Sequence, residues 1–392
     1  MDTSFTRFVI DGLRSFSSRT TWGPPVIIRP FADRKRLERA SWAFSTRRVA
    51  RDAVHTSEPP PGAPNPGDLV LCRVDALGHH AGLQLPNGRR KQMFPGDEII
   101  VAYGNRYASS QFEALVPSTF GPCHLVAGGG IASRAVGWHN KITKGPTHIT
   151  PLAILTDARG GCLNLRNFAV HPVNDLGDPG DSYPPTVAVV GTGMDSGKTQ
   201  SAAYFARGLI AAGLRVGYAK VTGTGAGGDT WLLTDAGADP VLDFTDAGFA
   251  TTYLASPTEV ESILTTLVAH QIHAGVDAIV LEIADGVYQR ETSALLCSDV
   301  FQQIVNGIIL AACDSMGASA GAHWLSRQRV PVLGVSGIIS AAPLQAREAS
   351  DVIGLPVYDR ESLGTASVAT EILKRNQRVE VVKTPMIRYV GK

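Results

Sequence analysis

One glycine-containing segment of the sequence suggests phosphate chemistry. Residues 187–199 read Val-Ala-Val-Val-Gly-Thr-Gly-Met-Asp-Ser-Gly-Lys-Thr, which is typical of a buried strand, a loop and the start of a helix. Glycines allow successive backbone N–H groups to point at phosphate oxygens, and a helix N-terminus adds positive charge. The pattern therefore predicts a phosphate-binding loop. Its expected nucleotide-binding residues are Gly193, Met194, Asp195, Ser196, Gly197, Lys198 and Thr199.

Two side chains at the end of this loop supply a charge and a metal ligand. The Lys198 ammonium suits the β- and γ-phosphates of a nucleotide, and the Thr199 hydroxyl is a ligand for Mg²⁺. The consensus loop has a glycine where this sequence has Thr192, although a glycine lies on either side of it. The loop is therefore a variant, found in the strand–loop–helix context that the motif requires.

Two acidic residues and a second lysine lie where expected strands end. Glu282 ends the apolar run 278–281, Lys220 ends an earlier strand-like run, and Asp229 follows the glycine-rich stretch 222–228. Ligands of open parallel sheets bind beyond the carboxyl ends of the strands, so all three residues fit a metal–nucleotide site. For Asp229 the alternative is a solvated loop, and for Lys220 it is a lysine at the surface.

From Thr186 onward, apolar strand-like runs alternate with helix-like segments. The runs are residues 186–190, 214–220, 277–283, 307–312 and 330–335. The stretches between them are long enough for crossover helices. This alternation predicts an α/β fold with a doubly wound, mostly parallel sheet of the P-loop NTPase class.

The preceding region is rich in expected strands. Residues 68–74 and 98–103 are strand-like, and residues 82–90 are typical of a hairpin because Asn87-Gly88 suits a tight turn. We expect a small barrel or sandwich here. The expected division of the chain is 1–65, a basic N-terminal arm with a proline-rich linker; 66–180, the β-rich domain; and 185–392, the P-loop domain.

The β-rich region is expected to shape the side of the site that binds a second substrate. The glycine loop 128–130 and the turn Arg89-Arg90-Lys91 are the parts expected to approach it, since a basic turn suits a carboxylate or a phosphate. The alternative is a separate module for oligomerisation.

Composition and charge exclude several classes of protein. The chain has 392 residues and a formal net charge of +1, which does not favour a nucleic-acid-binding protein. Neither a membrane-spanning apolar run nor a signal-peptide pattern is present in the sequence. Five scattered cysteines without a CxxC pair favour free thiols. We expect a cytoplasmic homodimer or higher homo-oligomer, with no membrane or nucleic-acid partner.

Together these residues resemble the dethiobiotin synthetase group of P-loop proteins, which includes cobyrinic acid amide synthases. The loop of that group reads Gly-Thr-x-x-x-x-Gly-Lys-Thr, which residues 191–199 match. Segments 217–224, 228–230, 281–286 and 312–317 are similar to further segments of the group, and the resemblance covers residues 185–375. Ile283-Ala284-Asp285 replaces a glycine-rich stretch of the group, and the sequence 334–337, Gly-Val-Ser-Gly, lacks its adenine-reading Asn.

The resemblance implies roles for particular residues. It implies ATP at the loop, with Mg²⁺ held by Thr199, Asp229 and Glu282. Lys198 and Lys220 would be the catalytic residues that stabilise the transferring phosphoryl group. In the group, ATP phosphorylates a carboxylate or carbamate, which then reacts with an amine or closes a ring.

A substrate contact and a substrate class follow from the same resemblance. Thr224 would lie near the substrate, which would be a small-molecule acid. The expected activity is that of an ATP-dependent ligase, synthetase or kinase, which phosphorylates a carboxylate or similar acceptor to activate it for ligation or cyclisation.

Two other classes of function remain alternatives. A nucleotide-switched P-loop ATPase acting on a protein partner typically has a second lysine five positions before the loop lysine, where this sequence has Gly193. A GTPase switch needs an Asn-Lys-x-Asp after the loop, and the sequence has none there. A scaffold with a degenerate loop would not need the intact Lys198, Thr199 and Glu282.

Three weaker signals complete the set. His79-His80 could ligate a metal, but no third ligand is evident and a loop is favoured. Residues 317–321 could suggest a nucleophile elbow, although close packing at a helix start is favoured. Asp314 and Ser315 are expected to face the nucleotide crevice and to touch the base or ribose.

Overall fold

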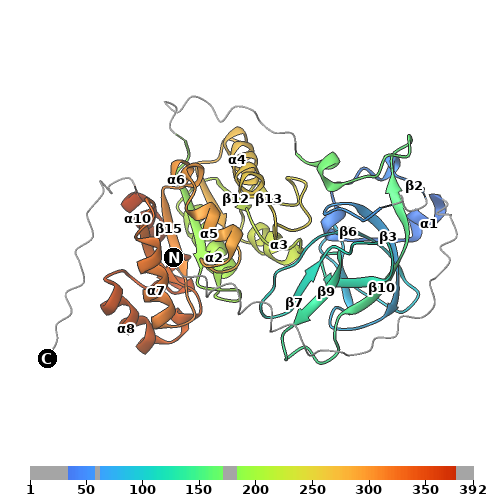
Figure 1. Cartoon of the computed structure of the whole chain (residues 1–392). Helices are drawn as coiled ribbons and strands as arrows, with labels where there is room; N and C mark the ends of the chain where they lie inside the picture. Colours follow the sequence, from blue (N-terminus) through green and yellow to red (C-terminus); the bar gives the residue numbers. More distant parts are fainter. Residues whose placement is uncertain (1–33, 58–61, 171–182, 377–392) are drawn as a thin grey trace, which may run out of the picture.

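A closed β-barrel and a parallel sheet flanked by helices make up the two halves of the chain (Figure 1). The computed structural model describes residues 34–57, 62–170 and 183–376. Most of the expected basic arm and part of the proline-rich linker lie outside these residues. Within the described ranges, no helix combines the length and apolarity that crossing a bilayer requires.

The N-terminal half is built around a ring of five paired strands. Its strands are β1 (Ser41–Trp42), β2 (His55–Ser57), β3 (Leu69–Ala76), β6 (Glu98–Tyr103), β7 (Phe112–Leu115), β8 (Cys123–Ala127), β9 (Ile131–Trp138) and β10 (Thr147–Thr156). Pairing runs β6-β3-β10-β8-β9, and a parallel pairing of β9 with β6 closes the ring. A separate hairpin joins β4 (Gly82–Gln84) to β5 (Arg90–Gln92), with Gly88 at φ +84° in its turn.

Both faces of the barrel strand β3 are buried over residues 69–72. Along β3, Leu69 and Leu71 belong to one apolar cluster, whereas Val70 and Cys72 belong to another. Successive side chains of a strand point to opposite faces, so the near-continuous apolar sequence of β3 matches its burial on both sides.

Residues 34–57 pack in the barrel half, whereas the sequence led us to expect them in an N-terminal arm. Helix α1 (Arg34–Arg39) is anchored by Arg36, whose Nε donates to Glu98 at 2.8 Å. Strands β1 and β2 pair with β6 and β10, and Trp42 is buried in the barrel's apolar cluster. These strands have two and three residues, too few for a periodic apolar pattern.

The C-terminal half is a doubly wound α/β sheet in which every strand pairing is parallel. Its strands are β11 (Thr186–Gly191), β12 (Val216–Lys220), β13 (Val241–Asp243), β14 (Ala278–Glu282), β15 (Gly307–Ala311) and β16 (Val332–Ser336). Their spatial order is β13-β12-β14-β11-β15-β16. The helices are α2 (Lys198–Ala211), α3 (Gly227–Asp235), α4 (Pro257–His273), α5 (Arg290–Leu296), α6 (Asp299–Ile304), α7 (Ser315–Leu325), α8 (Pro343–Ile353), α9 (Arg360–Leu363) and α10 (Ala366–Asn376).

Alternating residues of β11 show that helices cover both faces of this sheet. Ala188 and Val190 pack in a cluster with α4 to α7, whereas Val187 and Val189 pack in a cluster with α2, α9 and α10. The chain turns to opposite sides of β11, so a crevice opens beyond its carboxyl end. The predicted fold class is confirmed, and β13 is the one strand of this sheet that the apolar runs did not predict.

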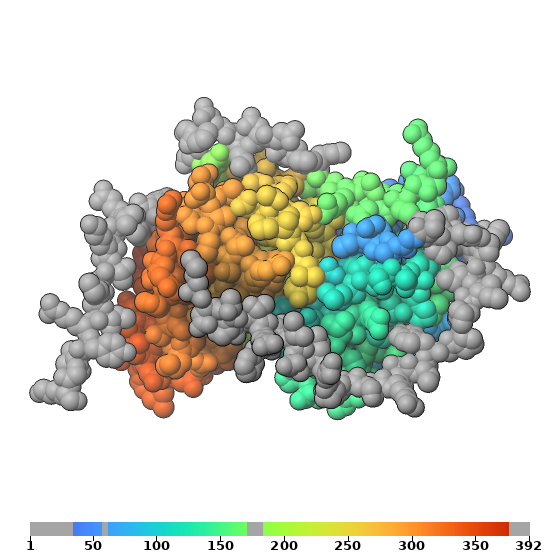
Figure 2. All heavy atoms as spheres, in the orientation of Figure 1, coloured from blue at the N-terminus to red at the C-terminus, as the bar shows by residue number. Residues whose placement is uncertain are grey.

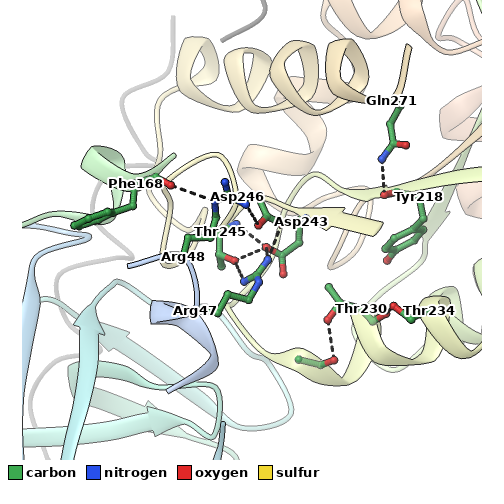
Figure 3. A network of polar contacts seen from close by, with 11 residues as sticks. Arg47, Arg48, Phe168, Tyr218, Thr230, Thr234, Asp243, Thr245, Asp246 and Gln271 are labelled. Atoms are coloured by element: carbon green, nitrogen blue, oxygen red, sulfur yellow. Dashed lines mark hydrogen bonds and ion pairs between the residues drawn. The ribbon is translucent and has the colours of Figure 1, made fainter. Parts of the chain in front are cut away.

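A buried polar network joins the two halves (Figure 3). Arg47, from the N-terminal half, donates through Nη2 to Asp246 Oδ2 at 2.6 Å and to Asp243 Oδ1 at 3.1 Å. Burial would lower the pKa of the Arg47 guanidinium, but the charges of the two aspartates outweigh it and raise that pKa. Arg48 Nε donates to the Phe168 carbonyl at 3.1 Å. Figure 2 shows the blue segment that carries these arginines lying against the yellow segment of the C-terminal half.

A second contact between the halves involves backbone alone. The turn 128–130, between β8 and β9, lies directly on the glycine-rich stretch that precedes α3. A Cβ on Gly129 would overlap the carbonyl oxygen of Gly225 and would lie 2.8 Å from Ala226 Cα. Only glycine permits this approach, so the turn and the stretch fit against each other without side chains.

Candidate active site

Lys220 and Glu282 lie side by side because their strands pair in register. Strands β12 and β14 are neighbours in which Lys220 lies opposite Glu282, and Lys220 Nζ is 3.1 Å from Glu282 Oε1. Tyr218, two residues earlier on the same face of β12, donates its hydroxyl to Glu282 Oε2 at 2.9 Å. The Glu282 side chain is 2% exposed, so these two partners fix its orientation.

Thr199 and Asp229 complete a cluster of oxygen atoms. Thr199, in the first turn of α2, has its Oγ1 3.2 Å from Asp229 Oδ1 and 3.1 Å from Glu282 Oε1. Asp229, in the first turn of α3, forms an ion pair with Lys220. Burial would raise the pKa of Asp229 and lower that of Lys220, but their mutual attraction reverses both shifts. The cluster therefore holds a charged lysine among negative carboxylates.

The loop between β11 and α2 wraps around Lys198. Its Nζ donates to the Gly193 carbonyl at 2.8 Å and to the Asp285 carbonyl at 2.9 Å. A Cβ on Gly191 would lie 2.9 Å from Lys198 Cδ, which explains why the loop starts with glycine. Gly197 has φ +95° immediately before the helix, a backbone conformation that suits glycine. The helix thus begins with its free N–H groups directed at the loop.

These features define a P-loop NTPase fold in the C-terminal half. A central parallel strand, β11, leads through a glycine-containing loop into α2, and an acid ends the adjacent strand β14. Burial lowers the pKa of the Lys198 ammonium, and the negative charge of Glu282 offsets part of that lowering.

A cavity of about 680 Å³ lies between the phosphate loop and the barrel. The C-terminal half lines it with loop residues 194–199 and with Lys220, Asp229 and Glu282. The barrel half lines it with side chains that include Gln84, Arg106 and Gln111. Both halves therefore contribute polar groups to one cavity.

Two hydrogen bonds hold the barrel against the walls of this cavity. Gln84 Oε1 accepts from the Gly227 N–H at 2.8 Å, at the start of α3. Ser110 Oγ lies 3.3 Å from Met194 Sδ, so the loop between β6 and β7 touches the phosphate loop itself.

Arg106 is the buried cation on the barrel side of the cavity. Its side chain is held by Gln111 Oε1, which accepts from Nη2 at 2.7 Å, and by His80 Nε2, 3.1 Å from Nη1. Since a guanidinium only donates, His80 Nε2 is the acceptor. Burial, followed by the charge of Arg106, lowers the pKa of His80 to about 3 and keeps the ring neutral. Sequence reasoning missed Arg106, because no motif surrounds it.

Asp285 is a second cavity residue that sequence reasoning missed. It follows β14 with φ +64°, and its carbonyl accepts from Lys198. Burial raises the pKa of its carboxyl group to about 6. Asp285 lies where the dethiobiotin synthetase group has a glycine-rich stretch. That difference could have indicated that a side chain faces the loop here.

The structure brings most of the expected site residues together. Lys198, Lys220 and Thr224 line the same cavity as Asp229 and Glu282, and loop residues Met194 to Thr199 also line it. Gly193 contributes its carbonyl to Lys198 instead of lining the cavity.

Some of the barrel residues that were expected to approach the substrate line the cavity, and others do not. Gly128 and Arg90 line the cavity, whereas Lys91 is paired with Asp97 at 3.2 Å outside it. His79 and His80 also line the cavity.

Asp314 and Ser315 do not line this cavity. Asp314 caps α7 by accepting from the Gly317 N–H at 2.7 Å, and Ser315 donates to Glu348 at 3.0 Å. The segment 317–321 lies within α7, where Gly321 packs against Leu310, as expected for close packing.

The cluster of Thr199, Asp229 and Glu282 has the chemistry of a Mg²⁺ site. A hydroxyl and two carboxylates are the hard oxygen donors that Mg²⁺ prefers. Over the described ranges, no group of three or more His, Cys, Asp or Glu side chains could hold a metal alone. The donor set fits an ion whose other ligands are phosphate oxygens and water, which is how Mg²⁺ usually binds beside nucleotides.

Comparisons with known proteins give fold-level similarity alone. No family model and no curated protein matches the chain. The 54 kDa protein of the signal recognition particle from Aeropyrum pernix, in complex with GDP, is 19% identical over 51% of each chain, with a TM-score of 0.34. The receptor FtsY from Elizabethkingia anophelis, in complex with GDP, is 19% identical over 51% of this chain and 65% of its own, with a TM-score of 0.35.

A protein of the DUF1611 family from Anabaena variabilis is 15% identical over 55% of this chain and 64% of its own, with a TM-score of 0.36. The chain thus spans between about half and two thirds of these proteins. The fold of the C-terminal half is established by its strand order and loop geometry.

Proposed function

We propose that this protein binds MgATP at the phosphate loop and transfers the terminal phosphoryl group to a carboxylate of a small acid. The observation that carries the proposal is the single cavity shared by the loop and the barrel. A second substrate in that cavity would face Lys198 and the cluster around Lys220 from the opposite side. A loop that served only as a switch would not need a cavity of about 680 Å³ lined by polar side chains of another half.

The reaction that we propose balances without an added acid or base. A carboxylate oxygen of the acid attacks the terminal phosphorus, the bond from that phosphorus to the bridging oxygen breaks, and ADP leaves with the electron pair. Lys198 and Lys220 provide positive charge where negative charge is shared among the phosphate oxygens. Mg²⁺ at Thr199, Asp229 and Glu282 would supply further neutralisation of the phosphates.

The product of this step would be an acyl phosphate, which an amine or an internal group can then attack. The similarity of residues 191–199 and 217–224 to the dethiobiotin synthetase group supports this kind of activation. Burial of Lys198 and Glu282 also supports it, since limited access of water around the reacting groups slows hydrolysis of an acyl phosphate.

Trapping the acyl phosphate tests the proposal. The full chain is incubated with MgATP, hydroxylamine and a panel of small carboxylic acids, and hydroxamate and ADP are measured together. We expect acid-dependent hydroxamate in step with ADP from the protein, and a loss of two orders of magnitude or more in the Lys198→Ala variant. Lys144→Ala, which removes an exposed lysine of the barrel half, is the control.

Two results separate this function from the alternative. ATP turnover that no acid stimulates, with no hydroxamate formed, would favour a nucleotide-switched ATPase that acts on a protein partner. Full turnover by Lys198→Ala would remove the phosphate loop from either function.

A further inference from the structure

Arg106 is a buried cation that makes no ion pair with the described residues. Its residue is 5% exposed, and its two hydrogen-bond partners, the Gln111 amide and the neutral His80 ring, carry no charge. The Arg106 Nε has no hydrogen-bond partner among the described residues. The carboxylate whose charge acts on Arg106 is that of Asp285, which lines the same cavity but does not form an ion pair with it among the described residues. A buried charge left in this state costs several kcal/mol, which an anion bound beside it would offset.

The guanidinium is held in place before any ligand binds. The backbone of Arg106 exchanges two hydrogen bonds with Ala114, of 2.7 and 2.9 Å, and its Cζ lies 5.9 Å from the centre of the Phe112 ring. Gln111 and His80 fix two of its terminal nitrogen atoms from the sides. The remaining N–H groups belong to a rigid fork that lines the cavity, and such a fork matches the two oxygens of a carboxylate.

Arg106 belongs to the half that does not supply the expected phosphate contacts. Lys198, Lys220 and the loop N–H groups already serve the phosphates, and they all belong to the C-terminal half. Arg106 reaches the cavity from the barrel, on a loop whose Ser110 touches Met194 of the phosphate loop. An acceptor lying between the two sides would have one end at the phosphate loop and the other at Arg106.

We infer that Arg106 binds a second acidic group of the acceptor, one that is not phosphorylated. The acceptor is therefore a small molecule with two carboxylates, one held by Arg106 and the other presented to the terminal phosphate. This inference rests on the proposed function and names the class of its substrate.

Binding of simple dicarboxylates tests the inference without turnover. The full chain is titrated by calorimetry with malonate, succinate, glutarate and adipate, first alone and then with MgADP present, and with the monomethyl ester of each acid. We expect at least one dicarboxylate to bind and its monoester to bind more weakly. Arg106→Gln should weaken that binding about 10- to 100-fold, the worth of a charged hydrogen-bonded contact. Arg134→Gln, which removes an exposed arginine of β9, should change it less than twofold.

A second variant guards against loss of folding in Arg106→Gln. Gln111→Glu places a carboxylate at the position whose oxygen already accepts from Arg106 at 2.7 Å. The internal carboxylate should occupy the guanidinium, weaken dicarboxylate binding by a similar factor and raise the melting temperature. A change that merely disturbed the structure would lower the melting temperature instead.

Each remaining outcome overturns the inference in a distinct way. If no dicarboxylate binds the unchanged protein while MgADP does, the carboxylate assignment fails and the nucleotide site stands. If Arg106→Gln weakens a non-hydrolysable ATP analogue but not the dicarboxylates, the guanidinium binds the terminal phosphate. If MgADP does not bind, the proposed function fails, and the titrations of the nucleotide-free protein still decide whether Arg106 binds carboxylates.

Discussion

The Thr199 hydroxyl lies between two carboxylates that belong to different parts of the sequence. It is 3.2 Å from Asp229 and 3.1 Å from Glu282, so it joins the first turn of α2 to α3 and β14. The hydroxyl therefore sits at the centre of the cluster that we assign to Mg²⁺.

Replacement of this hydroxyl tests the metal site. Thr199→Val keeps the shape of the side chain and removes the oxygen, so we expect the Mg²⁺ concentration for half-maximal turnover to rise about tenfold or more. Binding of ADP without metal should change little. Thr199→Ser keeps the oxygen and should behave as the unchanged protein. Equal Mg²⁺ dependence in both variants would exclude Thr199 as a ligand.

Asp285 makes stability depend on pH with a definite sign. Its folded-state pKa of about 6 lies above the ordinary 3.8, so burial favours the protonated carboxyl. Any stability that this group adds is complete below pH 3.8 and is lost as the pH rises through 6. At neutral pH the buried charge costs up to about 3 kcal/mol.

Asp285→Asn isolates this effect, because asparagine stays neutral and tolerates a positive φ. We expect the variant to exceed the unchanged protein in free energy of unfolding at pH 7.5, with the difference disappearing near pH 4. Urea unfolding at several pH values measures it, and Asp351→Asn, at an exposed position of α8, should show no pH-dependent difference. A constant difference from pH 4 to pH 7.5 would contradict the shifted pKa.

The site residues that the sequence predicted are those at the ends of parallel strands. Lys220 and Glu282 end strands, and the carboxyl ends of neighbouring parallel strands meet at one edge. Arg106 and His80 belong to the barrel half, and no local sequence pattern there predicts that they face the phosphate loop. Their roles depend on how the two halves pack, which a single sequence does not show.

The turn between β8 and β9 can pack against the stretch before α3 because Gly129 has no side chain. Gly129→Ala would force its Cβ against the Gly225 carbonyl, so we expect the free energy of unfolding to fall by about 1–3 kcal/mol. Denaturant unfolding measures this. Gly121→Ala is the control, because a Cβ there meets no atom within 4 Å. Equal stability of the two variants would show that the turn can move away from the stretch before α3.

Apolar runs predicted the elements whose burial depends on local sequence. The five expected strands of the C-terminal half correspond to β11, β12, β14, β15 and β16, each of which is buried on both faces. Strand β13 has three residues, two of them only partly buried, and no run of that length gives a period. Strands β1 and β2 are as short, and they form because β9 and β8 leave one end of β6 and one end of β10 unpaired.

At the scale of the whole molecule, the network around Arg47 ties the stability of one half to the other. Arg47→Ala would leave Asp243 buried without its cation and Asp246 with Arg48 alone, at 3.4 Å, and these two aspartate side chains are 2% and 5% exposed. We expect a loss of about 3–5 kcal/mol. Scanning calorimetry should show a lower melting temperature or two separate transitions.

The exposed pair of Arg375 and Glu371 provides the comparison. Both side chains are about half exposed, at 44% and 58%, so Arg375→Ala should cost less than about 1 kcal/mol. Asp246→Asn added to Arg47→Ala should recover part of the loss, because it removes the repulsion between the two buried aspartates. If Arg47→Ala and Arg375→Ala unfold alike, the network does not couple the halves.

The close approach of Gly129 to Gly225 also limits which substitutions the protein can accept during evolution. Gly129 cannot gain a side chain unless the stretch before α3 moves, whereas a Cβ on Gly225 would meet the Ala250 carbonyl oxygen of its own half at 2.9 Å. A side chain tolerated at position 129 should therefore be accompanied by a change in that stretch, and a barrel exchanged from a distant protein would have to present an equally bare turn to it.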